Sequence, residues 1–122
     1  MLADTSVWID HFRLGDNQLK AALEAGAVWM HPLVLGEIAC GNLASRATVL
    51  TLLHSLPALP VATDKEVLYF IDKHKLMGRG IGYIDAHLLA AARLADVPIW
   101  TKDKRLHTIA TDMALAYVGS RH

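Results

Sequence analysis

The amino-acid sequence predicts an α/β fold, namely a three-layer α/β/α sandwich around a mostly parallel central sheet. Short apolar or β-branched stretches alternate with helical stretches along the whole chain, without an internal repeat or a linker. This alternation is typical of a parallel sheet that helices cover on both faces. The chain has 122 residues and is 53% hydrophobic, so we expect one domain over residues 1–122 with a substantial core.

Extended segments are predicted where β-branched and aromatic residues are bounded by polar or turn-forming residues. They fall at residues 2–4, 27–31, within 56–63, 98–101 and 114–118. Between them, the helical spacing of apolar residues predicts helices. These helices cover residues 7–13, 17–25, 32–43, 46–56, 64–77, 83–95 and 104–111. We expect Ser45, and either Thr63 or Asp64, to act as N-caps.

The stretch from Gly80 to Leu106 combines a helix, a tight reversal, a short strand and a polar loop. The helix runs roughly 16 Å in one direction and the strand roughly 17 Å back, so Asp103 returns to the level of Asp85. Asp85 shares its helical stripe with apolar residues that must face the core. A carboxylate in that position costs free energy unless a positive group meets it.

Two further acids are expected at the same edge of the sheet. Asp4 ends the first strand, and Glu37 lies one turn into the helix after the second strand. Ligands bind to parallel sheets beyond the carboxyl ends of the strands. Each acid taken singly is explained equally well as a helix-dipole partner or a turn former. Their coincidence indicates a functional site formed from four separate segments by Asp4, Glu37, Asp85 and Asp103.

Crowded carboxylates repel one another unless a cation lies among them. Mg²⁺ prefers oxygen ligands, and two such ions can hold a phosphodiester and activate a water molecule. Several basic residues flank the acids along the chain, namely Arg79, Lys102, Lys104 and Arg105. They are candidates for binding the phosphates on either side of a scissile bond. Solvated surface charge explains each of them equally well when it is considered alone.

The chain resembles a PIN-domain ribonuclease, and specifically the VapC-type toxin of a VapBC toxin–antitoxin pair. The resemblance covers essentially the whole chain. It rests on LADTSVWID at residues 2–10, Glu37 in its helix, GIGYID at 80–85 with the alanine-rich helix, and TKDKRL at 101–106. The opening and the Thr-x-Asp element are fairly specific in combination, whereas Glu37 is placed mainly by order and spacing.

This resemblance implies a Mg²⁺-dependent endoribonuclease, the toxin of a type II pair, that cleaves RNA phosphodiesters by metal-activated water. Its catalytic residues and ligands of Mg²⁺ or Mn²⁺ would be Asp4, Glu37, Asp85 and Asp103. Ser6 and Thr101 match hydroxyl residues of the family, which we interpret as supports for the carboxylates. The implied partners are an RNA substrate, a cognate VapB-type antitoxin and a second copy of the chain in a homodimer.

The composition of the chain bears on where the protein is found and on which partners it can bind. Twelve Lys and Arg balance twelve Asp and Glu, which argues against a broad basic face but allows a local basic rim. The apolar runs are too short for a membrane span, and the N-terminus lacks a signal-peptide pattern. We therefore expect a cytoplasmic protein with no membrane partner. The single cysteine, Cys40, lies in an apolar helical pattern and is expected to be a buried, inert thiol.

Two other features concern the helices. His87 lies about 200° around its helix from Asp85, so we expect it to meet solvent, and no pair of histidines has zinc-ligand spacing. Residues 33–43 and 47–56 are apolar on more than one face. This surplus indicates either a partner surface, for a second subunit or an antitoxin segment, or one large core.

Three other functions fit parts of the pattern. A structure-specific DNA nuclease would use the same acids, although this chain lacks long insertions to thread a flap, and comparing RNA with DNA cleavage discriminates the two. A phospho-accepting receiver domain would need paired acids after the first strand, which residues 4–6 do not supply. A non-catalytic RNA-binding or assembly module is distinguished by measuring whether metal changes its stability.

Overall fold

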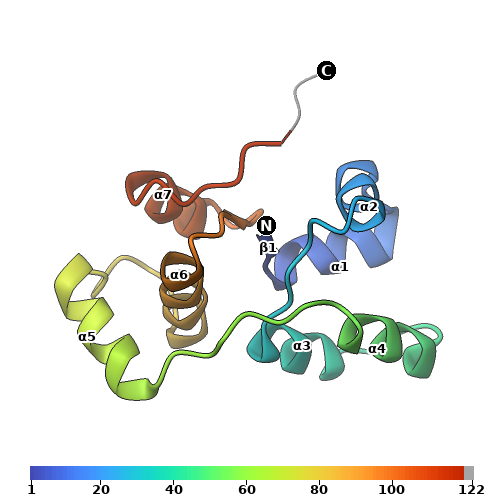
Figure 1. Cartoon of the computed structure of the whole chain (residues 1–122), viewed down its shortest axis with the longest axis horizontal. Coiled ribbons are helices and arrows are strands. Elements are labelled where there is room, and N and C mark those ends of the chain that lie inside the picture. Colours follow the sequence, from blue (N-terminus) through green and yellow to red (C-terminus); the bar gives the residue numbers. More distant parts are fainter. Residues whose placement is uncertain (120–122) are drawn as a thin grey trace.

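The computed structural model describes residues 1–119 of the chain. Helices dominate it, and two short strands lie at its centre (Figure 1). In chain order the elements are β1 (Leu2–Ala3), α1 (Thr5–Leu14), α2 (Asn17–Glu24), α3 (Pro32–Ala39), α4 (Arg46–His54), α5 (Asp64–His74), α6 (Tyr83–Ala95), β2 (Ile99–Trp100) and α7 (Lys104–Asp112).

A parallel sheet is built from β1, β2 and shorter extended segments. β1 and β2 pair in parallel, with Leu2 opposite Ile99. Single parallel bridges extend the pairing and join Leu2 to Trp29, Met30 to Ala58, and Ile99 to Ala116. The spatial order is therefore residue 58, residues 29–30, β1, β2 and residue 116. Each of the five segments predicted to be extended takes part in this sheet.

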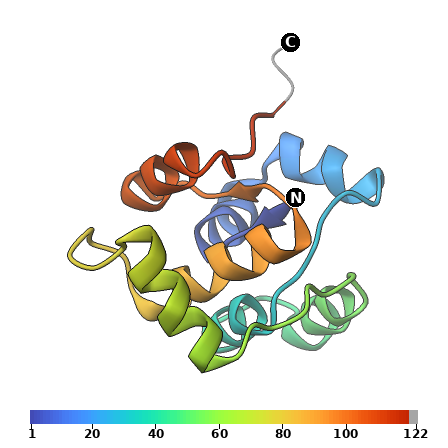
Figure 2. The same ribbon diagram turned by 60° about the vertical axis from the view of Figure 1, so that its left-hand side comes forward.

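Helices cover both faces of the sheet. Figures 1 and 2 both show β1 between α1 and α6. The sheet residues Leu2, Ala3 and Ile99 are at most 1% exposed, because they are packed between these two layers. This arrangement confirms the predicted α/β/α sandwich. None of the helices within residues 1–119 is long and apolar enough to cross a membrane.

Several helix boundaries differ from the prediction. α3 ends at Ala39, four residues early, because Gly41 and Asn42 follow and are poor helix formers. α4 begins after Ser45 as expected, but Ser45 has a left-handed φ of 51° and its side chain makes no capping hydrogen bond. α5 ends at His74 because Lys75 takes a left-handed conformation. Its N-cap is Thr63, which forms a capping box with Glu66.

Two predicted side-chain environments are wrong. Cys40 is exposed, because α3 ends there instead of continuing along the core. His87 is buried with 5% of its surface exposed, because α5 packs against that side of α6. The environment of Cys40 depends on where its own helix ends and that of His87 on a neighbouring helix, and neither follows from the helix period.

Candidate active site

Asp4 is a buried carboxylate at the carboxyl end of β1. It is 6% exposed and serves as the N-cap of α1, where its side chain accepts a hydrogen bond from the Val7 N–H. The Ser6 hydroxyl donates to its Oδ1 and the Thr101 hydroxyl donates to its Oδ2, both at 2.5 Å. Burial raises the pKa of Asp4, and the two hydroxyl hydrogen bonds oppose that rise.

The same two hydroxyls connect Asp4 to the loop after β2. The Lys102 N–H donates to Ser6 Oγ at 2.9 Å, and the Asp103 N–H donates to Thr101 Oγ1 at 3.0 Å. Each hydroxyl thus accepts from the loop backbone and donates to the carboxylate. Ser6 and Thr101 therefore fix the orientation of Asp4 and the position of the loop that carries Asp103.

Asp85 lies in the first turn of α6 and is half-buried. Burial is the largest cause of its raised pKa, and the charges of Asp4, Asp103 and Glu37 raise it further. A backbone hydrogen bond from Gly82 partly offsets these effects. Asp4, Glu37 and Asp103 are therefore close enough to act electrostatically on Asp85, although the four acids come from four separate segments.

The other two acids are exposed and held by local contacts. Asp103 is the N-cap of α7, and its Oδ1 accepts from the Leu106 N–H at 3.0 Å. Glu37 on α3 accepts at Oε1 from the Thr5 hydroxyl at 2.6 Å. Sequence reasoning did not select Thr5 as a site residue. The sequence feature that could have identified Thr5 is its position directly after Asp4, at the start of α1.

Three of the predicted phosphate-binding residues share one cavity. Arg79, Lys104 and Arg105 line a space of about 220 Å³ with Thr108 and Ile109. This cavity lies beside the first turn of α7, which follows Asp103 directly. Arg79 is partly neutralised, because its Nη2 lies 2.9 Å from Oδ2 of Asp112.

Lys102 differs from the other three basic residues. Its Nζ lies 3.1 Å from a carboxylate oxygen of Asp10 and 3.1 Å from one of Asp16. Hydrogen bonds to these two carboxylates raise the pKa of Lys102. The Lys102 ammonium is thus bound by α1 and the N-cap of α2. No short-range sequence pattern predicts these two ion pairs, because Asp10 and Asp16 are far from Lys102 in the sequence.

The acids fit a hard divalent cation. Within residues 1–119, no three His, Cys, Asp or Glu side chains are close enough to enclose an ion by themselves. Mg²⁺ is usually bound by only one or two carboxylates and keeps several waters, so it needs no such cage. A donor set of carboxylate oxygens selects Mg²⁺ or Mn²⁺ over softer metals. Burial and then repulsion by three carboxylates raise the pKa of Asp85, and a bound cation would stabilise its ionised form against both.

The sequence matches a known family over most of its length. A model of the PIN domain family matches residues 1–112. The chain belongs to the PIN-domain family. This PIN domain is also 41% identical over 117 residues to Ribonuclease VapC32 from two strains of Mycobacterium tuberculosis, covering 95% of this chain and 94% of the relative. These matches confirm the resemblance seen in the sequence.

Solved structures with the same fold are more distant in sequence. A toxin–antitoxin complex from Klebsiella pneumoniae matches with a TM-score of 0.63 and 23% identity, over 84% of this chain and 85% of that chain. The crystal structure of PAE2754 from Pyrobaculum aerophilum matches with a TM-score of 0.62 and 18% identity, over 88% and 82%. At these identities the similarity supports the fold of the PIN domain.

Proposed function

We propose that this PIN domain is a metal-dependent endoribonuclease and the toxin of a type II toxin–antitoxin pair. The observation that carries the proposal is the convergence of four acids, because Asp85 is half-buried and, after burial, the charges of Asp4, Asp103 and Glu37 raise its pKa. The 41% identity to a ribonuclease over nearly the full length of both chains supports it.

The four acids are the proposed metal-binding residues, one or two of them bound directly to the ion and the others through its waters, with Mg²⁺ as the preferred ion and Mn²⁺ as the alternative. A bound divalent cation would supply an activated water and neutralise charge on the scissile phosphate. Ser6 and Thr101 would orient the carboxylate of Asp4, and Thr5 would orient that of Glu37. These hydrogen bonds hold the ligands in place before the metal binds, which lowers the entropy lost on binding.

The cavity of Arg79, Lys104 and Arg105 is the proposed site for an RNA phosphate next to the cleaved bond. Guanidinium groups suit this role because they bind phosphate with two parallel hydrogen bonds. For Lys102 we propose a positioning role instead of the phosphate contact expected from the sequence. Its side chain holds Asp10 and Asp16, while its backbone N–H donates to Ser6.

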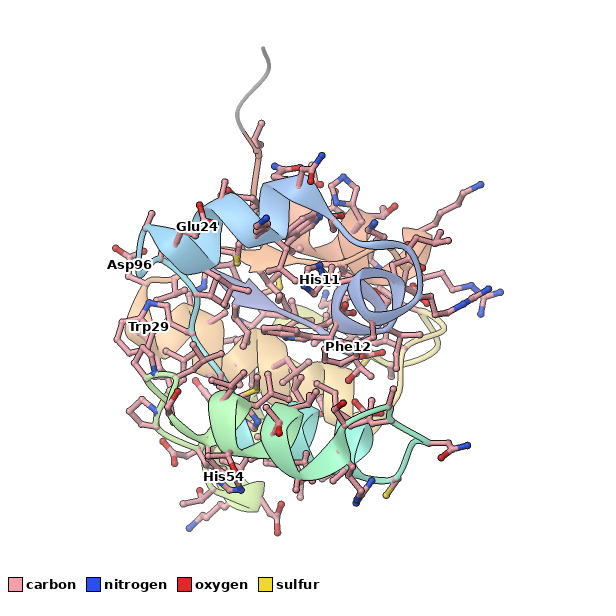
Figure 3. All side chains as sticks on the ribbon, turned by 90° about the vertical axis from the view of Figure 1, so that its right-hand side faces the viewer. His11, Phe12, Glu24, Trp29, His54 and Asp96 are labelled. Carbon is pink, nitrogen blue, oxygen red and sulfur yellow. The ribbon has the colours of Figure 1, made fainter. Side chains whose placement is uncertain are left out.

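An apolar groove between α1, α2 and α4 is the proposed binding site of the antitoxin. It has a volume of about 330 Å³, and in Figure 3 the labelled side chain of Phe12 lies between α1 and α4, whereas that of His11 lies between α1 and α2. Its lining residues are Trp8, His11, Phe12, Leu23, Val49, Leu52, Leu53, Ser55 and Leu56. Several come from the 47–56 stretch, whose surplus of apolar residues fitted either a partner surface or one large core. We also propose a homodimer, as the resemblance implies.

Substitution of the acids tests the nuclease function. We expect Asp85→Asn and Asp4→Asn each to abolish Mg²⁺-dependent RNA cleavage, because an amide is a poor ligand for Mg²⁺. Asp96→Asn is the matched control, since Asp96 is exposed at the other end of α6 and its left-handed conformation tolerates Asn. The measurement is gel-resolved cleavage of single-stranded RNA and DNA, with Mg²⁺ or with chelator. Undiminished cleavage by both variants contradicts the proposal, and cleavage of DNA alone identifies a DNA nuclease.

A further inference from the structure

We propose that a second groove, between α5 and α6, binds a single-stranded segment of the RNA substrate away from the cleaved bond. This inference rests on the proposed ribonuclease function of the PIN domain. The groove has a volume of about 700 Å³ and is separate from the four acids, none of which lines it. Figures 1 and 2 show α5 and α6 side by side.

The lining of the α5–α6 groove combines exposed apolar surface with cations. Tyr69 and Leu94 are 67% and 68% exposed and belong to neighbouring helices, so together they give the groove an apolar surface that is open to a ligand. Lys65, Lys73 and Arg93 lie around them in the same groove. A surface of this kind favours a ligand with both flat apolar groups and negative charge.

The order of these residues along α5 matches a nucleic-acid strand. Lys65, Tyr69 and Lys73 are four residues apart and therefore share one stripe of the helix, with about 5–6 Å between successive Cβ atoms. An aromatic ring thus lies between two cations. Sites for single-stranded nucleic acid use cations to follow the phosphates and aromatic rings to stack the bases.

The cations of the groove are available to a ligand. Neither Lys65, Lys73 nor Arg93 forms a salt bridge within the part of the chain that the structure describes. Among the lining residues of the described part of the chain, Glu66 is the one carboxylate, and its Oε1 accepts from the Thr63 N–H at 2.9 Å in the capping box. The pKa of His74 is lowered by burial and then by the charges of Arg93 and Lys73, so these two cations converge at one end of the groove.

A second copy of the chain fits this surface less well than RNA does. A two-fold interface brings the same patch of both copies together, so six cations would gather in one interface. Glu66 would be the single carboxylate per copy to offset them. Like charges facing each other in an interface are unfavourable, whereas phosphates neutralise all three cations.

The distance between the α5–α6 groove and the four acids means that only an RNA of several nucleotides could contact both. Asp85 is in the first turn of α6 and Arg93 is eight residues further on, which is about 12 Å along the helix. A strand that reaches both must extend beyond the nucleotides at the cleaved bond. The α5–α6 groove would thus favour RNA with a single-stranded extension over a minimal oligonucleotide.

Binding measured without metal tests this proposal independently of cleavage. The probe is a fluorescently labelled single-stranded RNA of mixed sequence, long enough to span both sites, titrated with the full chain in chelator over a range of KCl concentrations. We expect Lys65→Gln with Lys73→Gln to reduce the slope of log K against log salt by about 1.4, roughly 0.7 for each lost phosphate contact. We expect Tyr69→Ala to weaken binding about 5- to 150-fold without changing the slope.

Matched variants separate base stacking and local charge from general effects. Tyr69→Phe keeps the ring and should bind as the wild type does, and Lys20→Gln removes an exposed lysine from α2 without effect. If Tyr69→Ala and the double lysine variant bind RNA as the wild type does, the groove proposal is wrong. The same conclusion follows if sedimentation shows that Tyr69→Ala only breaks a dimer while its RNA affinity is unchanged.

Cleavage of the same RNA in Mg²⁺ distinguishes the two proposals. A wild-type chain that cleaves RNA while every groove variant binds normally overturns the groove proposal and leaves the ribonuclease function intact. A wild-type chain that does not cleave RNA overturns the ribonuclease function itself.

Discussion

In the folded chain the ionised form of the Asp85 side chain is destabilised by burial and by three neighbouring carboxylates, which raise its pKa. We predict that Asp85→Asn stabilises the metal-free chain at neutral pH by on the order of 1 kcal/mol, because the variant removes a half-buried, repelled charge. The raised pKa means that the folded state holds the proton more tightly than the unfolded chain. The advantage of the variant therefore shrinks as the pH falls through the raised pKa and is lost below the ordinary value of 3.8.

Urea unfolding in chelator at a series of pH values measures this difference, with Asp96→Asn as the control for loss of a surface charge. Added Mg²⁺ should stabilise the wild type more than Asp85→Asn, since the ion binds the folded state through the acids. A variant that is less stable than the wild type at neutral pH would show that the four acids do not repel one another.

The buried side chain of His31 leads to a second prediction, which concerns the dependence of stability on pH. It is fully buried, and its Nδ1 accepts from the Leu33 N–H at the start of α3. Burial and the neighbouring His87 lower its pKa from 6.5 to about 4. Between these two pH values the unfolded chain binds a proton at His31 and the folded chain does not. The free energy of unfolding therefore decreases progressively as the pH falls from 6.5 to 4.

We predict that His31→Asn, which keeps a capping side chain, loses this pH-dependent part of the unfolding free energy, worth roughly 3 kcal/mol in full. The measurement is the difference in unfolding free energy between wild type and variant at pH values across that range. His54→Asn, at an exposed histidine, is the control. Parallel pH profiles for the wild type and His31→Asn would contradict the prediction.

At the scale of the element, the position of α6 depends on α5. The N-cap of α6 is Gly82, which has no side chain to cap the helix. The first turn is held instead by Asp64 of α5, which accepts from the Tyr83 hydroxyl at 2.7 Å and lies 3.3 Å from Nε2 of His87. Asp85 lies between Tyr83 and His87 in the sequence but on the other side of α6, so α5 helps to place a proposed metal ligand by fixing the first turn of that helix.

The loop between α5 and α6 helps to position the side chain of Arg105, because Gly80 in this loop packs directly against it. Gly80 has a φ of 82°, and a Cβ at this position would lie 2.6 Å from Cδ and 2.8 Å from Nη1 of Arg105. We predict that Gly80→Ala destabilises the chain by about 1–2 kcal/mol through backbone strain and also weakens RNA binding by displacing Arg105. Urea unfolding and RNA anisotropy measure the two effects.

A double-mutant cycle isolates the contribution of Arg105. If Gly80→Ala acts on RNA binding through Arg105, it should cause no further loss of affinity in an Arg105→Ala background. An equal loss in both backgrounds would mean that the loop affects RNA binding by another route.

At the scale of the whole molecule, the proposed catalytic and partner surfaces are separate. The antitoxin groove uses α1, α2 and α4, and Leu52 within it is 62% exposed. We predict that Leu52→Glu weakens capture of the antitoxin by at least about tenfold while RNA cleavage is retained, because a buried carboxylate without a partner is costly. Co-purification with the product of the neighbouring reading frame, alongside the cleavage assay, measures both.

Leu14→Glu is the matched control, since Leu14 is 81% exposed at the end of α1 and does not line the groove. Loss of capture by both variants would point to a general effect of added charge. Retention of capture by Leu52→Glu would place the antitoxin on another surface.

The chain sequence determined the order of the elements and the positions of the acids along them. Alternating apolar patterns are local, so they predicted every segment of the parallel sheet and the helices on both faces. Asp4 and Asp103 follow strands, and Asp85 opens a helix, so the topology of a parallel sheet was enough to bring them to one edge.

Only the tertiary structure decided what each side chain meets. His87 is buried because α5 covers it, Lys102 is bound by Asp10 and Asp16, and Glu37 accepts from Thr5. These contacts join residues that are far apart in the chain, and they follow from how helices cross and where each helix ends. Helical and strand periods describe one element at a time, so they could place the acids at one edge but not show which groups orient them.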